Sequence, residues 1–157
     1  MNDLKIIPYS SEYAPFVKSL NVAWLEKFFV VEPFDKIVLS NPQEEIIDKG
    51  GQIFFAKYQN NIVGTFTLLK IDDFAYELSK MAVDEKFQGL GIGKFMMDYC
   101  ITFAENNNIK KLVLYSNTTL ATAINMYRKY GFIEASLGST VYKRADIKME
   151  KLISEIS

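Results

Sequence analysis

The sequence Met81-Ala-Val-Asp-Glu-Lys-Phe-Gln-Gly-Leu-Gly-Ile-Gly-Lys94 joins two segments with different hydrophobic patterns. Residues 74–83 are mostly apolar and contain neither glycine nor proline, which is typical of a strand. From Ile92 to Phe103, apolar side chains recur at steps of three and four residues. That period predicts a helix with one buried face. The stretch therefore predicts a strand, a glycine-rich turn and the start of a helix.

The turn carries glycines at the alternate positions 89, 91 and 93. Glycine lets the backbone approach a ligand closely and adopt dihedral angles that a Cβ atom disfavours. The first N–H groups of a helix have no partner within it, and the peptide dipoles add about half a positive charge there. This combination predicts a site for a phosphate or pyrophosphate group. The alternative is an ordinary glycine-rich turn that binds nothing.

Two well-known phosphate-binding motifs do not fit this turn. The P-loop needs four residues between its first glycine and the Gly-Lys pair, but Gly89 and Gly93 enclose three. It also needs Ser or Thr after the lysine, where this chain has Phe95. The dinucleotide-binding pattern G-x-G-x-x-G fails as well, because the glycines follow the pattern G-x-G-x-G.

The pattern that does fit is Gln88-x-x-Gly91-x-Gly93 after an apolar strand. It resembles the acyl-CoA pyrophosphate loop of the GNAT superfamily of N-acetyltransferases. The resemblance implies acetyl-CoA as co-substrate, with its pantetheine arm along the main chain near the end of the strand at Val83. The residues that it implies for cofactor binding by strand and loop are Met81, Ala82, Val83, Gln88, Gly89, Leu90, Gly91, Ile92, Gly93 and Lys94.

A second resemblance lies downstream, in Ala123-Ile124-x-x-Tyr127-x-x-x-Gly131-Phe132. It is similar to the second GNAT signature, in which the tyrosine lies near the thioester sulfur. The resemblance makes Tyr127 the candidate acid for the leaving thiolate, since a phenol titrates at about 10 and is protonated at neutral pH. A core tyrosine at helical spacing is the alternative.

Many GNAT proteins carry an asparagine seven residues before that tyrosine, where it touches the pantetheine arm. Leu120 occupies the position in this chain, and Asn117 is the nearest candidate for the contact.

Glu77 on the strand before the glycine loop is the candidate general base. Because side chains alternate along a strand, we expect Glu77, Ser79, Met81 and Val83 on one face and Lys80 on the other. A carboxylate among apolar neighbours has a raised pKa, which suits a base acting directly or through water. The same strand carries a catalytic glutamate in some GNAT enzymes. A solvent-facing or structurally paired glutamate is the alternative.

Composition excludes several other kinds of site. The chain has 157 residues and no histidine, so neither a Ser-His-Asp triad nor a histidine metal site can form, and we expect no metal. The net charge of −1 disfavours nucleic acid as a partner. Since no 18-residue apolar run or leader is present, we expect a soluble cytoplasmic protein that does not bind membranes. The single Cys100 suits a packing role.

The patterns predict one domain, residues 1–157, of the α/β (α+β) class. Apolar runs indicate strands at 4–9, 52–58, 62–71, 74–83, 109–115, 132–137 and 146–152. Helical periods or caps indicate helices that begin after a cap at Ser10 or Ser11, at 35, at 42, at 91 and at about 118. The GNAT resemblance implies a mixed, mostly antiparallel sheet of about six or seven strands with helices on both faces. It also implies that the sheet splays open between the strands ending at Val83 and Tyr115.

The predicted reaction is direct transfer of an acetyl group from acetyl-CoA to a primary amine in a ternary complex. The acceptor is a small molecule or a peptide, and a homodimer is frequent among GNAT proteins. The aromatic residues Trp24, Phe28, Phe29 and Phe34 either line an acceptor pocket or pack on the sheet. The linker 138–144 is placed to close over the acceptor. The alternative function is a non-catalytic acyl-CoA sensor or partner-binding module on the same scaffold.

Overall fold

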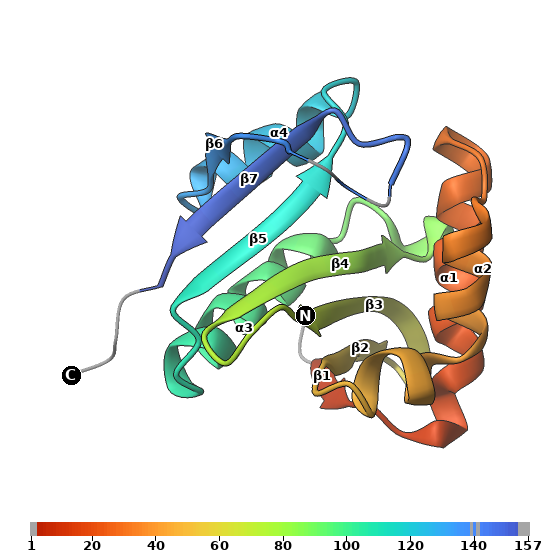
Figure 1. Ribbon diagram of the computed structural model, residues 1–157. Helices are drawn as coiled ribbons and strands as arrows, with labels where there is room; N and C mark the ends of the chain where they lie inside the picture. The colour runs from red at the N-terminus through yellow and green to blue at the C-terminus, as the bar shows by residue number, and fades with distance from the viewer. Residues whose placement is uncertain (1–2, 139, 141, 154–157) are drawn as a thin grey trace.

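The computed structural model describes residues 3–138, 140 and 142–153, which form one seven-stranded sheet with helices on both faces (Figure 1). The strand order is β1-β2-β3-β4-β5-β7-β6. Among the described residues, β4 and β5 are the one pair of neighbouring strands that is parallel, and the other neighbours are antiparallel. The predicted fold class is therefore confirmed. The strands are β1 (Leu4–Pro8), β2 (Gln52–Tyr58), β3 (Asn61–Lys70), β4 (Ala75–Val83), β5 (Lys111–Ser116), β6 (Ile133–Ala135) and β7 (Ile147–Leu152).

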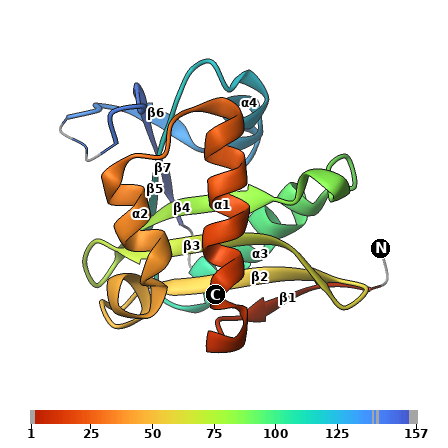
Figure 2. The ribbon, with the colours of Figure 1, turned by 90° about the vertical axis from the view of Figure 1, so that its right-hand side faces the viewer.

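The helices divide between the two faces of the sheet. One face carries α1 (Ala14–Phe28) and α2 (Pro33–Ser40), which lie in front of the sheet in Figure 2, whereas α3 (Ile92–Asn106) lies behind it. The helix α4 (Ala121–Lys129) packs with α3 on this second face through Ile124. Short helical turns occupy Ser11–Tyr13, Gln43–Ile47 and Glu85–Phe87.

Each face of the sheet has its own hydrophobic core, as the alternation of side chains along the strands requires. Phe54 on β2 and Phe66 on β3 pack toward α3, and neighbouring Phe55 packs toward α1 and α2. All three rings are almost fully buried. Burial of each such side chain contributes on the order of 1.5–3 kcal/mol, so the two cores fix the sheet between its helices.

The sheet opens between β4 and β5. The two strands pair only at Ala75–Lys111, Tyr76–Leu112 and Glu77–Val113. After the Glu77–Val113 pair the two strands separate. From there β4 stays paired with β3 as far as Val83, and β5 stays paired with β7 as far as Ser116. The predicted splay is therefore present, and the edge of β4 that follows Glu77 has no strand partner on the β5 side among the described residues.

A β-bulge in β4 overturns one expectation about side-chain direction. Thr65 lies opposite Ala82 and Thr67 lies opposite Ser79, so Phe66 alone faces two residues of β4. Lys80 takes up the extra length with a φ of +53°. The bulge reverses the alternation, so Glu77 does not share a face with Met81 and Val83 as predicted. Met81 and Val83 pack on the α3 side, whereas Lys80 joins Glu77 on the α2 side.

None of the helices within the described residues is long and apolar enough to span a membrane.

Candidate active site

The glycine loop lies at the surface at the start of α3. Gly91 is the residue before the helix, with a φ of +79°, and Gly89 has a φ of +81°. Both values lie in the left-handed region that favours glycine. A Cβ atom at either position would meet no atom within 4 Å, so the backbone faces open space rather than a packed neighbour.

The other loop residues divide into exposed and buried ones. Gln88, Leu90 and Lys94 are exposed, and Ile92 is 2% exposed because its side chain belongs to the core. Only the backbone of Ile92 is therefore available to a ligand. The geometry agrees with a loop that binds anions through its amides, although its contact with a cofactor stays a prediction.

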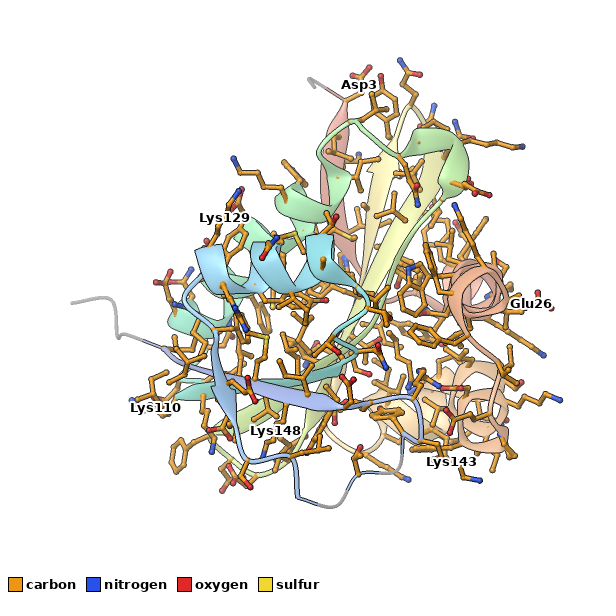
Figure 3. The ribbon with its side chains drawn as sticks, turned by 90° about the horizontal axis from the view of Figure 1, so that it is seen from above. Asp3, Glu26, Lys110, Lys129, Lys143 and Lys148 are labelled. Atoms are coloured by element: carbon orange, nitrogen blue, oxygen red, sulfur yellow. The ribbon has the colours of Figure 1, made fainter. Side chains whose placement is uncertain are left out.

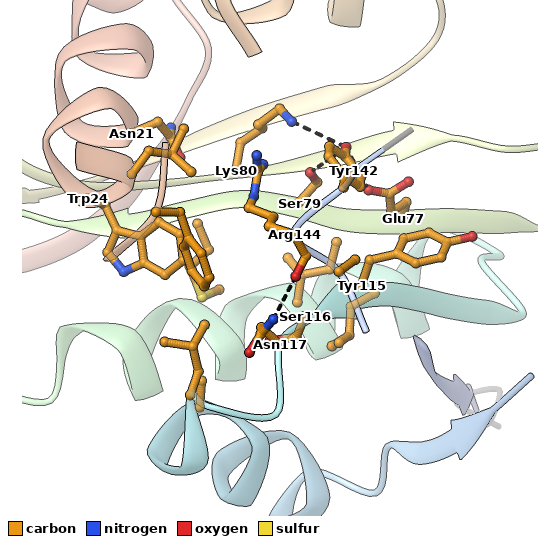
Figure 4. Close-up of a pocket in the computed structure, with 18 of the residues that line it drawn as sticks. Asn21, Trp24, Glu77, Ser79, Lys80, Tyr115, Ser116, Asn117, Tyr142 and Arg144 are labelled. Carbon is orange, nitrogen blue, oxygen red and sulfur yellow. Dashed lines mark hydrogen bonds between the residues drawn. The ribbon is translucent and has the colours of Figure 1, made fainter. Parts of the chain in front are cut away.

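A pocket of about 120 Å³ occupies the gap where β4 leaves β5 (Figure 4). Segments from α1, β4, β5, α4 and the β6–β7 linker line it. It brings together four of the predicted site residues, Glu77, Met81, Asn117 and Tyr127. Ala82, Val83 and the glycine loop are not among its lining residues, as expected if they hold the more distant parts of a long cofactor.

Tyr127 reaches the pocket from α4. Its ring lies 6.0 Å from that of Phe132, edge to face, and its backbone carbonyl accepts a hydrogen bond from the Phe132 amide. Burial raises the pKa of Tyr127 to about 12, so the phenol is protonated at neutral pH. Tyr127 therefore packs on Phe132 and also lines the pocket, and its role as a proton donor stays a prediction.

Glu77 lies at the last paired position of β4, where the splay begins. Its Oε2 accepts a hydrogen bond of 3.1 Å from the phenol of Tyr142. Burial raises the pKa of Glu77, against the lowering effects of nearby Lys80 and of hydrogen bonds with Tyr142 and Ser79. Glu77 is partly buried and forms no ion pair within the part of the chain that the structure describes, and a raised pKa suits a general base.

The amide of Asn117 is largely engaged within the protein. Its Nδ2 donates to the carbonyl of Arg144 at 2.7 Å, and its Oδ1 accepts from the backbone and the hydroxyl of Thr119. Asn117 therefore anchors the β6–β7 linker to the end of β5, and its second amide N–H has no acceptor among the described residues. Its contact with the pantetheine arm stays a prediction.

Sequence patterns missed a cluster of charges on the other side of Glu77. Arg144 in the β6–β7 linker forms a bidentate ion pair with Asp35 of α2, at 2.8 and 2.9 Å. It also donates to Glu32 at 3.1 Å. Burial raises the pKa of Asp35, but hydrogen bonds from Arg144 and from the Glu32 amide outweigh it and hold that pKa below its usual value.

The same cluster surrounds Lys80, whose Nζ lies 3.8 Å from Asp35. The only sequence signals for these contacts were a lysine inside a predicted strand and an arginine in a predicted linker. These signals do not predict that Asp35 and Arg144, which are 109 positions apart, form an ion pair.

The predicted acceptor-side residues are partly confirmed as pocket residues. Trp24 and Phe29 line the pocket with Tyr142 and Arg144 of the linker. Phe28 is 45% exposed, and Phe34 packs on the Tyr142 ring at 5.9 Å instead. Residues 139 and 141 of the linker lie outside the described residues.

Comparison with known proteins agrees with the geometry. The family model described as Acetyltransferase (GNAT) family matches residues 16–132. An uncharacterized N-acetyltransferase of Dictyostelium discoideum is 40% identical over 58 residues, which are 37% of this chain and 27% of that protein. The [ribosomal protein bS18]-alanine N-acetyltransferase of Escherichia coli K12 is 25% identical over 119 residues, 76% of each chain.

Solved structures share the fold. A GNAT-family acetyltransferase from Staphylococcus aureus Mu50 superposes with a TM-score of 0.85 and 24% identity, over 96% of this chain and 99% of that one. A GNAT-family acetyltransferase from Elizabethkingia anophelis with acetyl-CoA bound gives a TM-score of 0.66 and 24% identity, over 98% and 100%. Since the family model also covers most of the chain, the protein belongs to the acetyltransferase (GNAT) family and is an acetyl-CoA-dependent acyltransferase.

Proposed function

We propose that the protein transfers the acetyl group of acetyl-CoA directly to a primary amine in a ternary complex. The observation that carries this proposal is the pocket between β4 and β5, which has Glu77 and Tyr127 in one lining. A base for the acceptor and an acid for the leaving group are the two proton-transfer roles that this reaction needs.

The glycine loop is proposed to bind the pyrophosphate of the cofactor. The residues proposed for this are Gln88, Gly89, Leu90, Gly91, Ile92, Gly93 and Lys94. Support comes from the open space over the glycines and the free amides at the start of α3. The pantetheine arm then follows the unpaired edge of β4 at Met81, Ala82 and Val83 toward the pocket, in the direction of Asn117.

The proposed chemistry uses one proton donor and one proton acceptor. The acceptor ammonium loses a proton to Glu77, directly or through water, and the free amine attacks the thioester carbonyl. A main-chain amide of β4 stabilises the oxyanion. The tetrahedral intermediate then expels the thiolate, which Tyr127 protonates. The attacking nitrogen gives up its second proton, which returns through water to the Tyr127 phenolate, so that the neutral acetylated amine and CoA leave and the phenol is restored.

The acceptor class is a small-molecule amine or a peptide amine. The name of the Escherichia coli relative, an N-acetyltransferase of an alanine in a ribosomal protein, supports testing a peptide N-terminus. The pocket's aromatic side chains, Trp24 and Phe29, give any such acceptor an apolar wall beside the charged cluster. A homodimer stays a prediction that light scattering checks.

The test is thioester consumption from acetyl-CoA with a panel of alkylamines, amino sugars and peptides, followed by mass spectrometry of the products. We expect one amine product that is 42 Da heavier, formed together with free CoA. If acetyl-CoA binds but no amine is acetylated, the alternative of a non-catalytic acyl-CoA sensor replaces this proposal.

A further inference from the structure

The phenol oxygen of Tyr142 lies within hydrogen-bond distance of three polar side chains of β4. It lies 3.1 Å from Glu77 Oε2, 3.2 Å from Lys80 Nζ and 3.3 Å from Ser79 Oγ (Figure 4). Side chains at 77 and 79 share a face of a regular strand, but the side chain at 80 does not. The bulge and the φ of +53° at Lys80 bring it to the same face, so the convergence depends on a local distortion.

Such a distortion has a cost. A residue other than glycine is destabilised in the left-handed region, because its Cβ atom comes too close to the following carbonyl oxygen. Lys80 also brings its amine into the interior, where its side chain is 4% exposed. Packing alone does not require a lysine in this place, since an apolar side chain would avoid desolvation of a charge.

The contacts of Lys80 stabilise its cation only partly. An ammonium group has three N–H donors. Among the described residues, its one hydrogen-bond acceptor is Tyr142, because Asp35 lies 3.8 Å away and already accepts two hydrogen bonds from Arg144. The rings of Tyr142 and Phe34 lie 4.6 and 5.6 Å from Nζ. Lys80 can therefore lose a proton and become the neutral amine.

The charged groups around Lys80 come from every element packed against it. The groups that face it are Asp35 of α2, Glu32 at the N-cap of α2, Glu77 of β4, and Arg144 and Tyr142 of the β6–β7 linker. Burial lowers the pKa of Lys80 to about 8, against the raising effect of Asp35 and Glu77. At mildly alkaline pH the group changes between amine and ammonium.

We infer that Tyr142 and Lys80 form a proton relay behind Glu77, with Lys80 as the final proton acceptor of the acetyl-transfer reaction. The inference rests on the proposed function. Glu77 takes a proton from the acceptor ammonium and becomes a carboxylic acid. Its O–H then donates to the Tyr142 oxygen, while the Tyr142 O–H is transferred to the neutral Lys80 amine.

The relay is balanced. It ends with a Glu77 carboxylate, a Tyr142 phenol and a Lys80 ammonium, and this is the state in which Lys80 donates to Tyr142 and Tyr142 donates to Glu77. The acceptor has become a neutral amine with a free electron pair. Tyr142 and Lys80 act through Glu77 and are positioning residues, whereas Glu77 is the group that meets the substrate.

The test compares the pH dependence of kcat for the wild type and three variants, with the most active amine of the panel. The wild type should gain rate between pH 7 and 9, with a midpoint near pH 8. Tyr142→Phe keeps the ring and removes the hydroxyl, and Lys80→Met keeps the length and removes the amine. Both should lose this rise and be about tenfold slower at pH 9.

The matched control is Lys143→Met. Lys143 is exposed at the surface of the same linker (Figure 3), and its backbone, not its side chain, contacts Glu32. This variant should keep the wild-type profile. A Tyr142→Phe enzyme with an unchanged midpoint and rate would overturn the relay.

A second measurement does not depend on activity or on the folding of Lys80→Met. In the wild type with 13C-labelled lysine, NMR should find one lysine that titrates near pH 8, and Glu77→Gln should lower its midpoint because a negative charge is removed. Titration of every lysine above pH 10 would overturn the relay. A wild type that acetylates no amine would instead remove the proposed function, so the two failures differ.

Discussion

At the scale of single residues, Tyr127 is the proposed acid for the leaving thiolate. Replacement of Tyr127 by Phe should lower turnover by roughly 100-fold, since general acids contribute about 10²–10⁴. Affinity for acetyl-CoA should change little, because the ring keeps its packing on Phe132. Steady-state kinetics with a separate binding titration checks both values.

The matched control is Tyr130→Phe on the same helix end. The Tyr130 phenol bonds to Asp98 and to the carbonyl of Lys94, outside the pocket lining. It should retain turnover close to the wild type. Wild-type turnover in Tyr127→Phe would remove Tyr127 from the proposed mechanism.

Sequence reasoning at this scale succeeded where side-chain direction follows local periodicity. The helical spacing that ends at Gly131 brought Tyr127 inward, and the strand pattern put Glu77 and Ser79 together. It failed at Lys80, because a bulge depends on the partner strand and has no signal in the residue itself.

At the scale of elements, the loop between β4 and α3 depends on the backbone conformation of Gly91. The substitution Gly91→Ala should lower acetyl-CoA affinity about tenfold or more, since the new Cβ points into the open space proposed for pyrophosphate. The left-handed φ should also cost roughly 1 kcal/mol of folding stability. Calorimetric titration and urea unfolding measure the two effects.

Gly50→Ala separates these two effects. Gly50 has a φ of +91°, and the three atoms nearest to an added Cβ all belong to the side chain of Lys70, which can shift and lies away from the pocket lining. It should lose similar stability but keep full acetyl-CoA affinity. Equal affinity in Gly91→Ala and the wild type would argue against anion binding by this loop.

The elements themselves were largely predictable. The strand at 52–58 has the predicted bounds, and the boundaries of β3, β4 and β7 agree within a residue. β6 is shorter than the predicted 132–137, because only three of its residues find a partner on β7. The local sequence pattern indicates where a strand can form, and the length of the strand depends on how many of its residues pair with a neighbouring strand.

At the scale of the whole molecule, the Asp35–Arg144 pair ties the β6–β7 linker to α2. Asp35→Asn should destabilise the fold by about 3–5 kcal/mol, because it breaks a buried bidentate ion pair and leaves Arg144 with Glu32 as its one carboxylate partner among the described residues. The control Asp73→Asn removes an exposed pair with Lys70 and should cost less than about 1 kcal/mol. Urea unfolding at pH 7 compares them, and equal losses would contradict a structural role for Asp35.

The pair also has a signature in pH. The folded-state pKa of Asp35 lies below its ordinary value of 3.8, so its stabilising effect is complete above that value and is lost as pH falls through the lower folded pKa. Wild-type stability should therefore fall more steeply than that of Asp35→Asn below about pH 4. Parallel curves would contradict the assignment.

These long-range contacts could not be predicted from the sequence. An aspartate is common in the first turn of a helix, and Asp35 caps α2 there by accepting a hydrogen bond from the backbone amide of Glu32. Nothing local indicates that it also holds Arg144, because ion pairs across 109 residues follow from the packing of the whole chain.

The central claim is that the loop and the splayed strands bind acetyl-CoA. Calorimetric titration with acetyl-CoA, paired with a thermal melt, tests it most directly, with ATP and NAD as competitors for a general nucleotide site. We expect saturable binding that ATP and NAD do not displace, and stabilisation of about 2.7 kcal/mol at 100 times Kd. Absence of both heat and thermal stabilisation at millimolar acetyl-CoA would contradict it.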